Sequence, residues 1–412
     1  MTDARRVAAS RAAATGLALT ALAVVVYWFS NRDFDAGRGD FFYLADAFLH
    51  GRTWLEFRPG PFDVIALDDR FFVPFAPFPA IALAPLVALL GPVTADQVES
   101  GINAALAALD VWLCWVLLGR LGVSRLGDRL AVAVLFAFST AIWWVTTRGG
   151  VWHTGHLIAT ALTFGCLIEL WSSRPRPWLV GLLAGCAFLT RAPLALAIPF
   201  YLLLLDVRRP VAEPEIEGGF TPSTRPRWPI RGWALLAVGV LPSVGFFFWY
   251  NVARFGDPLE SGYALAALPA FLEAQRQVGL FSLAHVPTNL DYFLFHLPYR
   301  IADAPFFRPD GLGLSVLVTS PGLLLAALAP WRVWRSWLLL GAAIAVLVPT
   351  LLYYGGGWLQ YGYRYFLDSV PFVVALCGLA LARRPGIGRG WVLLIGFGVV
   401  INALGVYWAY RI

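Results

Sequence analysis

An acidic and aromatic stretch, residues 31–72, holds the residue types best suited to chemistry. It directly follows the first long apolar run of the chain. Carboxylates beside a bilayer add little to stability, so we interpret this stretch as a surface that works on a substrate. Its eight carboxylates are Asp33, Asp35, Asp40, Asp46, Glu56, Asp63, Asp68 and Asp69.

Asp40 begins a segment with helical periodicity. Apolar residues recur at 41, 44 and 48 and at 42, 45 and 49, which predicts an amphipathic helix at the membrane surface over residues 40–50. Asp40 could cap the N-terminus of that helix. It could also act as a general base toward an acceptor hydroxyl, and the two roles are compatible.

Two further acidic pairs lie in the same stretch. Asp33 and Asp35 form a DxD triplet, which could hold a divalent cation, share an acceptor, or be a solvated turn. Asp68 and Asp69, followed by Arg70, predict a charged turn.

Basic side chains follow in later polar segments. Arg148 and His153 belong to a short segment that could bind a phosphate or anchor the chain at the membrane interface. Asn251, Arg254 and Glu260 belong to a polar patch that could bind a sugar or phosphate, or form a helix end and turn. Arg191 could contact a phosphate at the outer side of the membrane or anchor the end of a helix.

The stretch 353–368 combines three glycines with aromatic side chains and Arg364. Glycines let the backbone approach a ligand, and Trp358, Tyr361 and Tyr363 could stack on a sugar or a prenyl chain. Arg364 offers a planar fork for phosphate. An interfacial aromatic belt would explain the aromatics, but not the glycines beside Arg364.

Composition sets the class of protein. The hydrophobic fraction is 59%, above the roughly 45–50% of soluble domains, and many apolar runs approach the ~20 residues that cross a bilayer. The net charge of +6 comes from arginines scattered between apolar runs, which favours loop topology over nucleic-acid binding. The four cysteines lie in apolar runs without metal-ligand spacing.

Arginine position predicts the topology of a single integral membrane domain, residues 1–412. Arginines cluster in six segments, which we place on the cytoplasmic side together with the N-terminus: 5–11, 120–129, 174–176, 208–231, 332–335 and 383–389. About 11 transmembrane helices follow: 13–30, 100–118, 133–147, 154–171, 178–190, 193–206, 233–250, 312–330, 337–354, 366–382 and 391–409.

Segments outside these helices complete the predicted architecture. Residues 31–99 form a first outer loop with juxtamembrane helices, because four prolines in 73–91 suit a continuous span poorly. Residues 251–311 form a second long outer loop. Residues 207–231, rich in Pro, Gly and charge, are a cytoplasmic linker. The expected fold is therefore all-α and polytopic.

Five blocks of sequence, in order, resemble the GT-C superfamily of polyprenyl-phosphate-dependent membrane glycosyltransferases. The similarity is to bacterial relatives of protein O-mannosyltransferases and of the lipid A aminoarabinose transferase. The blocks are GDFFYLADAFLHGRTW (39–54), VPFAPFPAIALAPLVALLG (73–91), GLLAGCAFLTRAPLALAIPF (181–200), NVARFGDPLESGY (251–263) and GGGWLQYGYRYFLDSVPF (355–372).

The resemblance implies a transferase that moves a sugar from a polyprenyl-phosphate donor to a hydroxyl on a glycan, lipid or protein. The active site would lie on the outer face of a bacterial cytoplasmic membrane. Asp40 matches the acid that serves as base in the family. Phe41 stands where many members have Glu, so Asp33 and Asp35 remain alternatives for the base.

The resemblance also implies basic residues in later loops that contact the donor phosphate. Arg364 matches this role, together with Arg254, His153 and Arg191. A divalent cation is left open, because branches of the superfamily differ in their need for metal. Two other functions remain: a transporter or flippase of lipid-linked sugars, and a non-catalytic membrane assembly protein.

Overall fold

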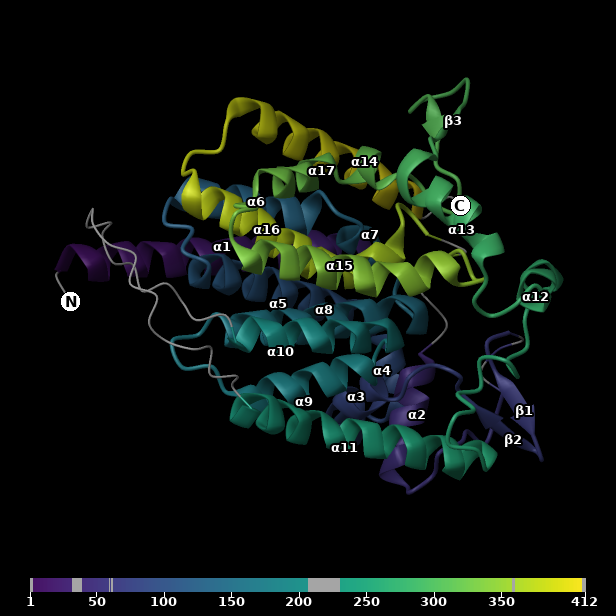
Figure 1. The fold of residues 1–412 in the computed structure, drawn as a ribbon. Helices are drawn as coiled ribbons and strands as arrows, with labels where there is room; N and C mark the ends of the chain where they lie inside the picture. Colours follow the sequence, from purple (N-terminus) through teal and green to yellow (C-terminus); the bar gives the residue numbers. More distant parts are fainter. Residues whose placement is uncertain are drawn as a thin grey trace.

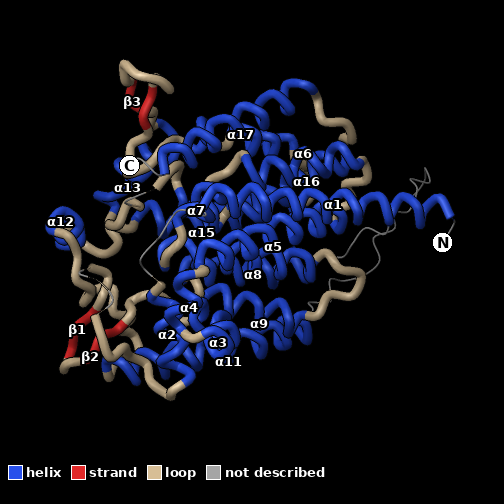
Figure 2. The backbone as a smooth tube through the Cα atoms, turned by 180° about the vertical axis from the view of Figure 1, so that it is seen from behind, coloured by secondary structure: helices blue, strands red, loops and turns tan. Residues whose placement is uncertain are grey.

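The computed structural model describes residues 3–31, 39–58, 60, 62–206, 230–357 and 360–409. Long helices lie side by side with their axes in roughly one direction, and short helices and two β-hairpins gather at one end (Figures 1 and 2). The N-terminus lies at the opposite end. We call the end that carries the hairpins the loop end.

Seven helical segments in the described residues are long and apolar enough to cross a membrane. They are α1 (Asp3–Asn31), α5 (Glu99–Arg120), the pair α6 (Leu126–Phe138) and α7 (Ile142–Arg148), α8 (Val151–Leu170), α11 (Ile230–Phe255), α15 (Trp334–Leu352) and α17 (Arg389–Ala409). This set confirms an α-helical membrane protein.

Four shorter apolar helical segments accompany them. They are α3 (Phe78–Leu90), α9 (Pro177–Phe188), the pair η1 (Ala192–Ala197) and α10 (Ile198–Asp206), and α16 (Val370–Arg383), which follows the short helix η5 (Arg364–Asp368). The count of 11 crossings stays a prediction, because length and composition identify only the seven.

Two segments that we predicted as continuous helices are interrupted. The helix predicted over 312–330 is divided into α14 (Val316–Thr319) and the 3₁₀ helix η4 (Pro321–Leu328). Pro321 has no N–H to continue the ladder and begins η4. The helix predicted over 133–147 is likewise broken between α6 and α7.

The largest core lies along the middle of the bundle. Phe136 of α6 and Phe164 of α8 pack edge to face at 5.1 Å, and Phe372 of α16 is also fully buried. Glycines bring α9 and α11 into backbone contact: a Cβ on Gly181 or on Gly239 would lie about 2 Å from a carbonyl oxygen of the other helix. Small residues at such crossings are typical of membrane helix pairs.

The short elements cluster at the loop end (Figure 1). They are α2 (Asp40–Leu49), β1 (Ile65–Leu67), β2 (Arg70–Phe72), α4 (Pro92–Gln97), α12 (Ala270–Gln277), η2 (Leu283–His285), α13 (Val286–Leu290), η3 (Asp291–Phe295), β3 (Tyr299–Arg300) and β4 (Phe307–Arg308). Strands β1 and β2 pair antiparallel, as do β3 and β4.

Two local predictions for the first outer loop are confirmed. The predicted surface helix is α2, which begins at Asp40 with Gly39 in the N-cap position. Asp68 and Asp69 form the two-residue turn between β1 and β2. Both have positive φ, 49° and 59°, as type I′ hairpin turns require.

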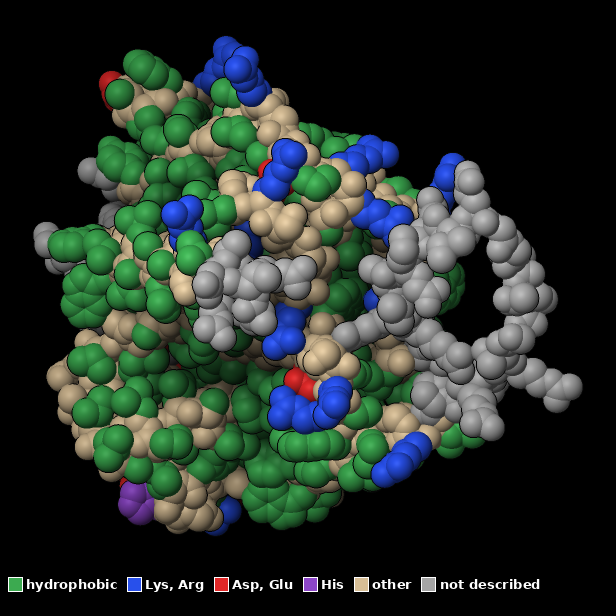
Figure 3. Space-filling model, turned by 90° about the vertical axis from the view of Figure 1, so that its left-hand side faces the viewer, with side chains coloured by type: hydrophobic (Ala, Val, Ile, Leu, Met, Phe, Trp, Pro, Cys, Tyr) green, Lys and Arg blue, Asp and Glu red, His purple; other side chains and the backbone are tan. Residues whose placement is uncertain are grey.

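The end opposite the loop end is rich in arginine. Figure 3 views the molecule from this side and shows many basic side chains and few acidic ones. The exposed arginines at the helix termini here are Arg120, Arg125, Arg174, Arg176, Arg231, Arg332, Arg383, Arg384 and Arg389. Asp128 and Glu169, also at this end, are buried, and Glu169 binds Arg176 at 2.9 Å.

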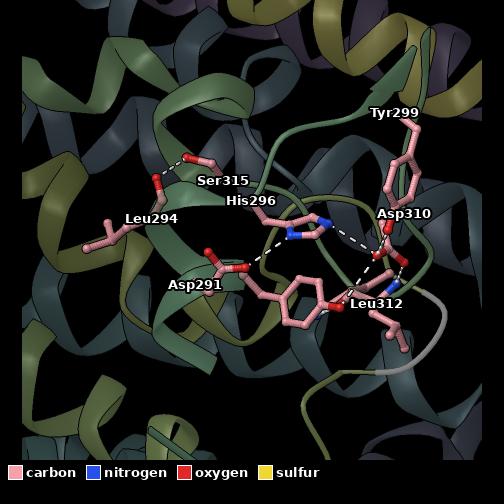
Figure 4. A network of polar contacts seen from close by, with 9 residues as sticks. Asp291, Leu294, His296, Tyr299, Asp310, Leu312 and Ser315 are labelled. Carbon is pink, nitrogen blue, oxygen red and sulfur yellow. Dashed lines mark hydrogen bonds and ion pairs between the residues drawn. The ribbon is translucent and has the colours of Figure 1, made fainter. Parts of the chain in front are cut away.

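A polar network fixes the base of the β3–β4 hairpin (Figure 4). The two ring nitrogens of His296 face carboxylate oxygens of Asp291 and Asp310, each at 3.1 Å. Asp310 also accepts hydrogen bonds from the Tyr299 hydroxyl at 3.1 Å and the Leu312 N–H at 2.9 Å. Asp310 is thus the common acceptor that closes this hairpin.

We expect Asp310→Ala to loosen the hairpin while leaving the helix bundle folded. Hydrogen bonds to a charged group contribute about 1.5–3 kcal/mol each, so chymotrypsin should cleave at Tyr299, Phe306 or Phe307 about 10-fold faster or more. Asp303→Ala, an exposed change on the same hairpin, is the matched control. Equal cleavage of the two variants would contradict a closing role for Asp310.

Candidate functional site

A cavity of about 70 Å³ opens at the loop end. Two charged side chains line it, Asp63 and Arg364. Its aromatic walls are Phe75, Trp152, Tyr263, Tyr353, Tyr354 and Tyr365. These residues come from four segments that are distant in the sequence: the first loop, the start of α8, the loop after α11 and the stretch after α15.

Arg364 begins η5 and is 5% exposed. One guanidinium nitrogen, Nη1, lies 3.2 Å from His153 Nε2, while His153 Nδ1 lies 2.6 Å from the carbonyl oxygen of Gly149. A carbonyl can only accept, so Nδ1 carries the proton and Nε2 accepts from Arg364. The imidazole is therefore neutral and orients the guanidinium. The structure brings together two residues that the sequence predicted for phosphate binding.

A second guanidinium, that of Arg191, also lies near the Tyr365 ring. The Cζ atoms of Arg191 and Arg364 lie 5.5 and 5.3 Å from the centroid of the Tyr365 ring. Arg191 Nε donates to Asp368 Oδ2 at 2.5 Å, and Asp368 Oδ1 lies 2.9 Å from His156 Nδ1. Asp368 thus fixes Arg191 beside the cavity.

Sequence reasoning did not single out Asp368, the partner of His156. Both side chains are fully buried. Burial of a carboxylate requires a charged or polar partner. The acid in RYFLD directly precedes an apolar run, which indicates that it is buried and that such a partner lies nearby. The sequence did not show that this partner is Arg191.

Asp63 is the acid of the first loop that the structure places in the cavity. Its φ is +53°, and its N–H donates to the Ala267 carbonyl at 2.8 Å, while the Ala267 N–H donates to the Val64 carbonyl at 3.0 Å. These bonds join the first loop to the loop after α11. Asp63 was one of eight candidate carboxylates, and nothing in its local sequence set it apart.

Tyr263 lies close enough to charged residues around the cavity for them to shift its pKa. Burial raises the pKa of Tyr263 to about 12; Arg191 opposes this shift, and Asp63 adds to it. The phenol therefore stays protonated at neutral pH and can donate a hydrogen bond within the cavity.

Asp40 is not among the residues that line the cavity. Its side chain is buried, at 2% exposure, and Phe41 beside it contacts Phe75 with 6.4 Å between ring centroids. Burial raises the pKa of Tyr43 in the same helix, with added contributions from Asp96 and Asp40. Both carboxylates thus lie close enough to Tyr43 to affect its pKa. The role of Asp40 as base stays a prediction.

Asn251 and Arg254 at the end of α11, and Glu260 in the loop that follows, form hydrogen bonds within the chain. Arg254 donates to the carbonyls of Val73 at 3.1 Å and Ser261 at 3.3 Å, and to Asn251 Oδ1 at 2.9 Å. Glu260 accepts a backbone N–H at 2.5 Å. None of these three is among the residues that line the cavity. Their predicted ligand contacts stay predictions.

Other candidates also bind backbone carbonyls. Arg148 donates to Ala409 O at 2.9 Å, Tyr361 to a carbonyl of α17 at 2.6 Å, and Tyr363 to a carbonyl of α15 at 3.1 Å. Both tyrosines are buried. They hold the stretch before η5 against two membrane helices, which positions Arg364.

Three candidates lie outside the described residues: Asp33, Asp35 and Trp358. Within the ranges that the structure describes, no group of three or more His, Cys, Asp or Glu residues is arranged to hold a metal ion. The DxD triplet is not covered by that statement, so a divalent cation stays a prediction.

Comparisons with known proteins give little similarity. No family model matches the sequence, and none of the curated proteins matches it. The fold is similar to the crystal structure of the apo oligosaccharyltransferase of Archaeoglobus fulgidus, with 13% sequence identity and a TM-score of 0.46. The similarity covers 96% of this chain and 55% of that one, so the chain spans about half its length. We base neither fold family nor activity on this similarity.

Proposed function

We propose that this chain is a membrane glycosyltransferase of the GT-C type. It transfers a sugar from a polyprenyl-phosphate donor to a hydroxyl acceptor at the outer face of a bacterial cytoplasmic membrane. The observation that carries the proposal is the cavity at the loop end, where Arg364, aromatic walls and a first-loop carboxylate meet. The sequence blocks that resemble GT-C enzymes contribute Arg364 and part of the aromatic walls.

The guanidinium groups suit a leaving phosphate. Arg364 is buried and oriented by His153, and Arg191, also near Tyr365, is held by Asp368. Charge-assisted hydrogen bonds in a site shielded from water are about twice as strong as neutral ones. Fixed cations therefore stabilise the negative charge that develops on the phosphate as the sugar leaves.

The remaining chemistry is a single displacement. The acceptor oxygen attacks the anomeric carbon, and the bond from that carbon to the phosphate oxygen breaks. Polyprenyl phosphate departs with the bonding electron pair. Asp40, or Asp33 or Asp35 in its place, takes the proton of the acceptor hydroxyl.

The charge distribution supports the proposed side of the membrane. Exposed arginines cover the end opposite the cavity, and cytoplasmic loops are the ones enriched in arginine. We expect Ala302→Cys, in the β3–β4 hairpin, to react with an impermeant maleimide in intact cells. Arg384→Cys should react only after permeabilisation. The reverse pattern would place the cavity in the cytoplasm and contradict the proposal.

The transferase activity can be tested with purified protein in nanodiscs. The protein is incubated with a panel of polyprenyl phosphates that carry single sugars, together with hydroxyl acceptors, and free polyprenyl phosphate is measured. We expect acceptor-dependent release for at least one sugar. Transbilayer movement of intact donor in vesicles, without any release, would instead identify a flippase.

A further inference from the structure

We infer that Asp63, with the tyrosines around it, forms a subsite for a single sugar residue that is attached directly to the donor phosphate. This inference rests on the proposed function and assigns a role to lining residues other than Arg364. It gives Asp63 a binding role that is separate from the proton transfer proposed for Asp40.

The arrangement of charges leads to this assignment. Asp63 and Arg364 are the charged side chains that line the cavity, and they have opposite sign. In the proposed function, the donor phosphate binds Arg364. In a polyprenyl-phosphate sugar, the sugar is bonded directly to that phosphate. The sugar therefore occupies the same cavity, where Asp63 is the carboxylate among the described lining residues. A carboxylate only accepts hydrogen bonds, and sugar hydroxyls donate them.

The walls of the cavity fit the same ligand. Tyr263, Tyr354 and Tyr365 present ring faces and hydroxyl groups, which suit the apolar face and the polar edge of a sugar ring. The Tyr263 hydroxyl stays protonated, so it can donate to a sugar oxygen while Asp63 accepts from a sugar hydroxyl.

The size of the cavity limits the ligand. Its volume is about 70 Å³, below the ~150 Å³ of a cavity that holds benzene. An oligosaccharide would not fit within these walls, and even one ring requires part of the sugar to extend into the opening. A longer glycan would extend further out of the cavity than a single hexose or pentose.

The backbone directs the Asp63 side chain. Its positive φ of +53° is uncommon for a residue other than glycine, and its N–H is held by the Ala267 carbonyl at 2.8 Å. Asn adopts this conformation as readily as Asp does, so Asp63→Asn preserves the loop while removing the charge. Asp68→Asn is a matched control, because Asp68 also has positive φ, 49°, and is exposed in the hairpin turn.

The experiment measures two affinities in nanodiscs for each variant. One ligand is a bacterial polyprenyl phosphate, and the other is the same lipid carrying one hexose or pentose. For wild type we expect the sugar-bearing lipid to bind more tightly. Asp63→Asn should lower this preference about 10-fold or more, the effect of one hydrogen bond to a charged group. Its affinity for the sugar-free lipid should not fall.

Two further variants distinguish a role of Asp63 in sugar binding from a general effect on lipid binding. Asp68→Asn should keep the wild-type preference, and Arg364→Ala should weaken binding of both lipids. A wild-type preference in Asp63→Asn would overturn the role of Asp63 and leave the transferase proposal intact. No preference in the wild-type protein would overturn the sugar subsite itself, while the release assay reports separately on transfer.

Discussion

Arg364→Ala should slow release of polyprenyl phosphate from the sugar donor by about 10²–10³-fold, the usual effect of losing one fixed donor to developing negative charge. Arg364 is 5% exposed and lines the cavity, so water cannot easily replace the lost cation. His153 holds one nitrogen of its guanidinium at 3.2 Å. The measurement is the initial rate of lipid-phosphate release at several donor concentrations.

Arg364→Lys and Arg300→Ala complete this test. Lysine retains a positive charge but not the planar fork, so its rate should fall between those of wild type and Arg364→Ala. Arg300 is exposed on strand β3, and its loss should leave the rate unchanged. Because removing a buried cation also affects folding, thermal unfolding of each variant is measured alongside. A folded Arg364→Ala protein with wild-type donor kinetics would exclude Arg364 from phosphate binding.

The sequence predicted well those features that depend on neighbouring residues. Apolar runs predicted the long helices, and the spacing from Asp40 onward predicted α2. Asp68 and Asp69 predicted the turn between β1 and β2, because short acidic side chains tolerate positive φ. Each of these follows from local periodicity or local backbone preference.

The site is formed by pairs of residues that are far apart in the sequence, so its composition could be predicted only in part. Arg364 and His153, which are 211 positions apart, were both candidates, and the structure places them in contact. Asp63 could not be chosen from eight similar acids, since its position depends on backbone bonds to Ala267. Asp368 was missed because its cation, Arg191, lies 177 positions away.

Local sequence also does not separate side chains that bind ligands from side chains that bind backbone. Arg254 and Tyr361 stand in polar or aromatic stretches like that of Arg364, yet both are hydrogen-bonded to carbonyls of the chain. A buried carbonyl and a phosphate oxygen attract the same donors. Only the fold shows which of these acceptors is within reach.

Asp40→Asn should reduce sugar transfer by about 10²–10⁴-fold, the usual contribution of a general base. Asparagine has nearly the same shape and cannot take a proton. Asp40 is the first residue of α2, where a negative charge contributes about 0.3–1 kcal/mol through the helix dipole when exposed and up to about 2 kcal/mol when partly buried, so thermal unfolding of the variant is measured as well. The measurement is transfer to acceptor, with donor affinity determined in parallel and expected to be unchanged.

Asp46→Asn is the control in the same helix, because Asp46 faces His50 and Arg52 at the other end of α2. It should retain wild-type transfer. If Asp40→Asn also retains it, Asp40 is not the base, and Asp33→Asn and Asp35→Asn become the deciding variants. If transfer and donor affinity fall together, Asp40 acts by supporting the Phe41–Phe75 wall, because loss of a base alone slows the chemical step without weakening the donor complex.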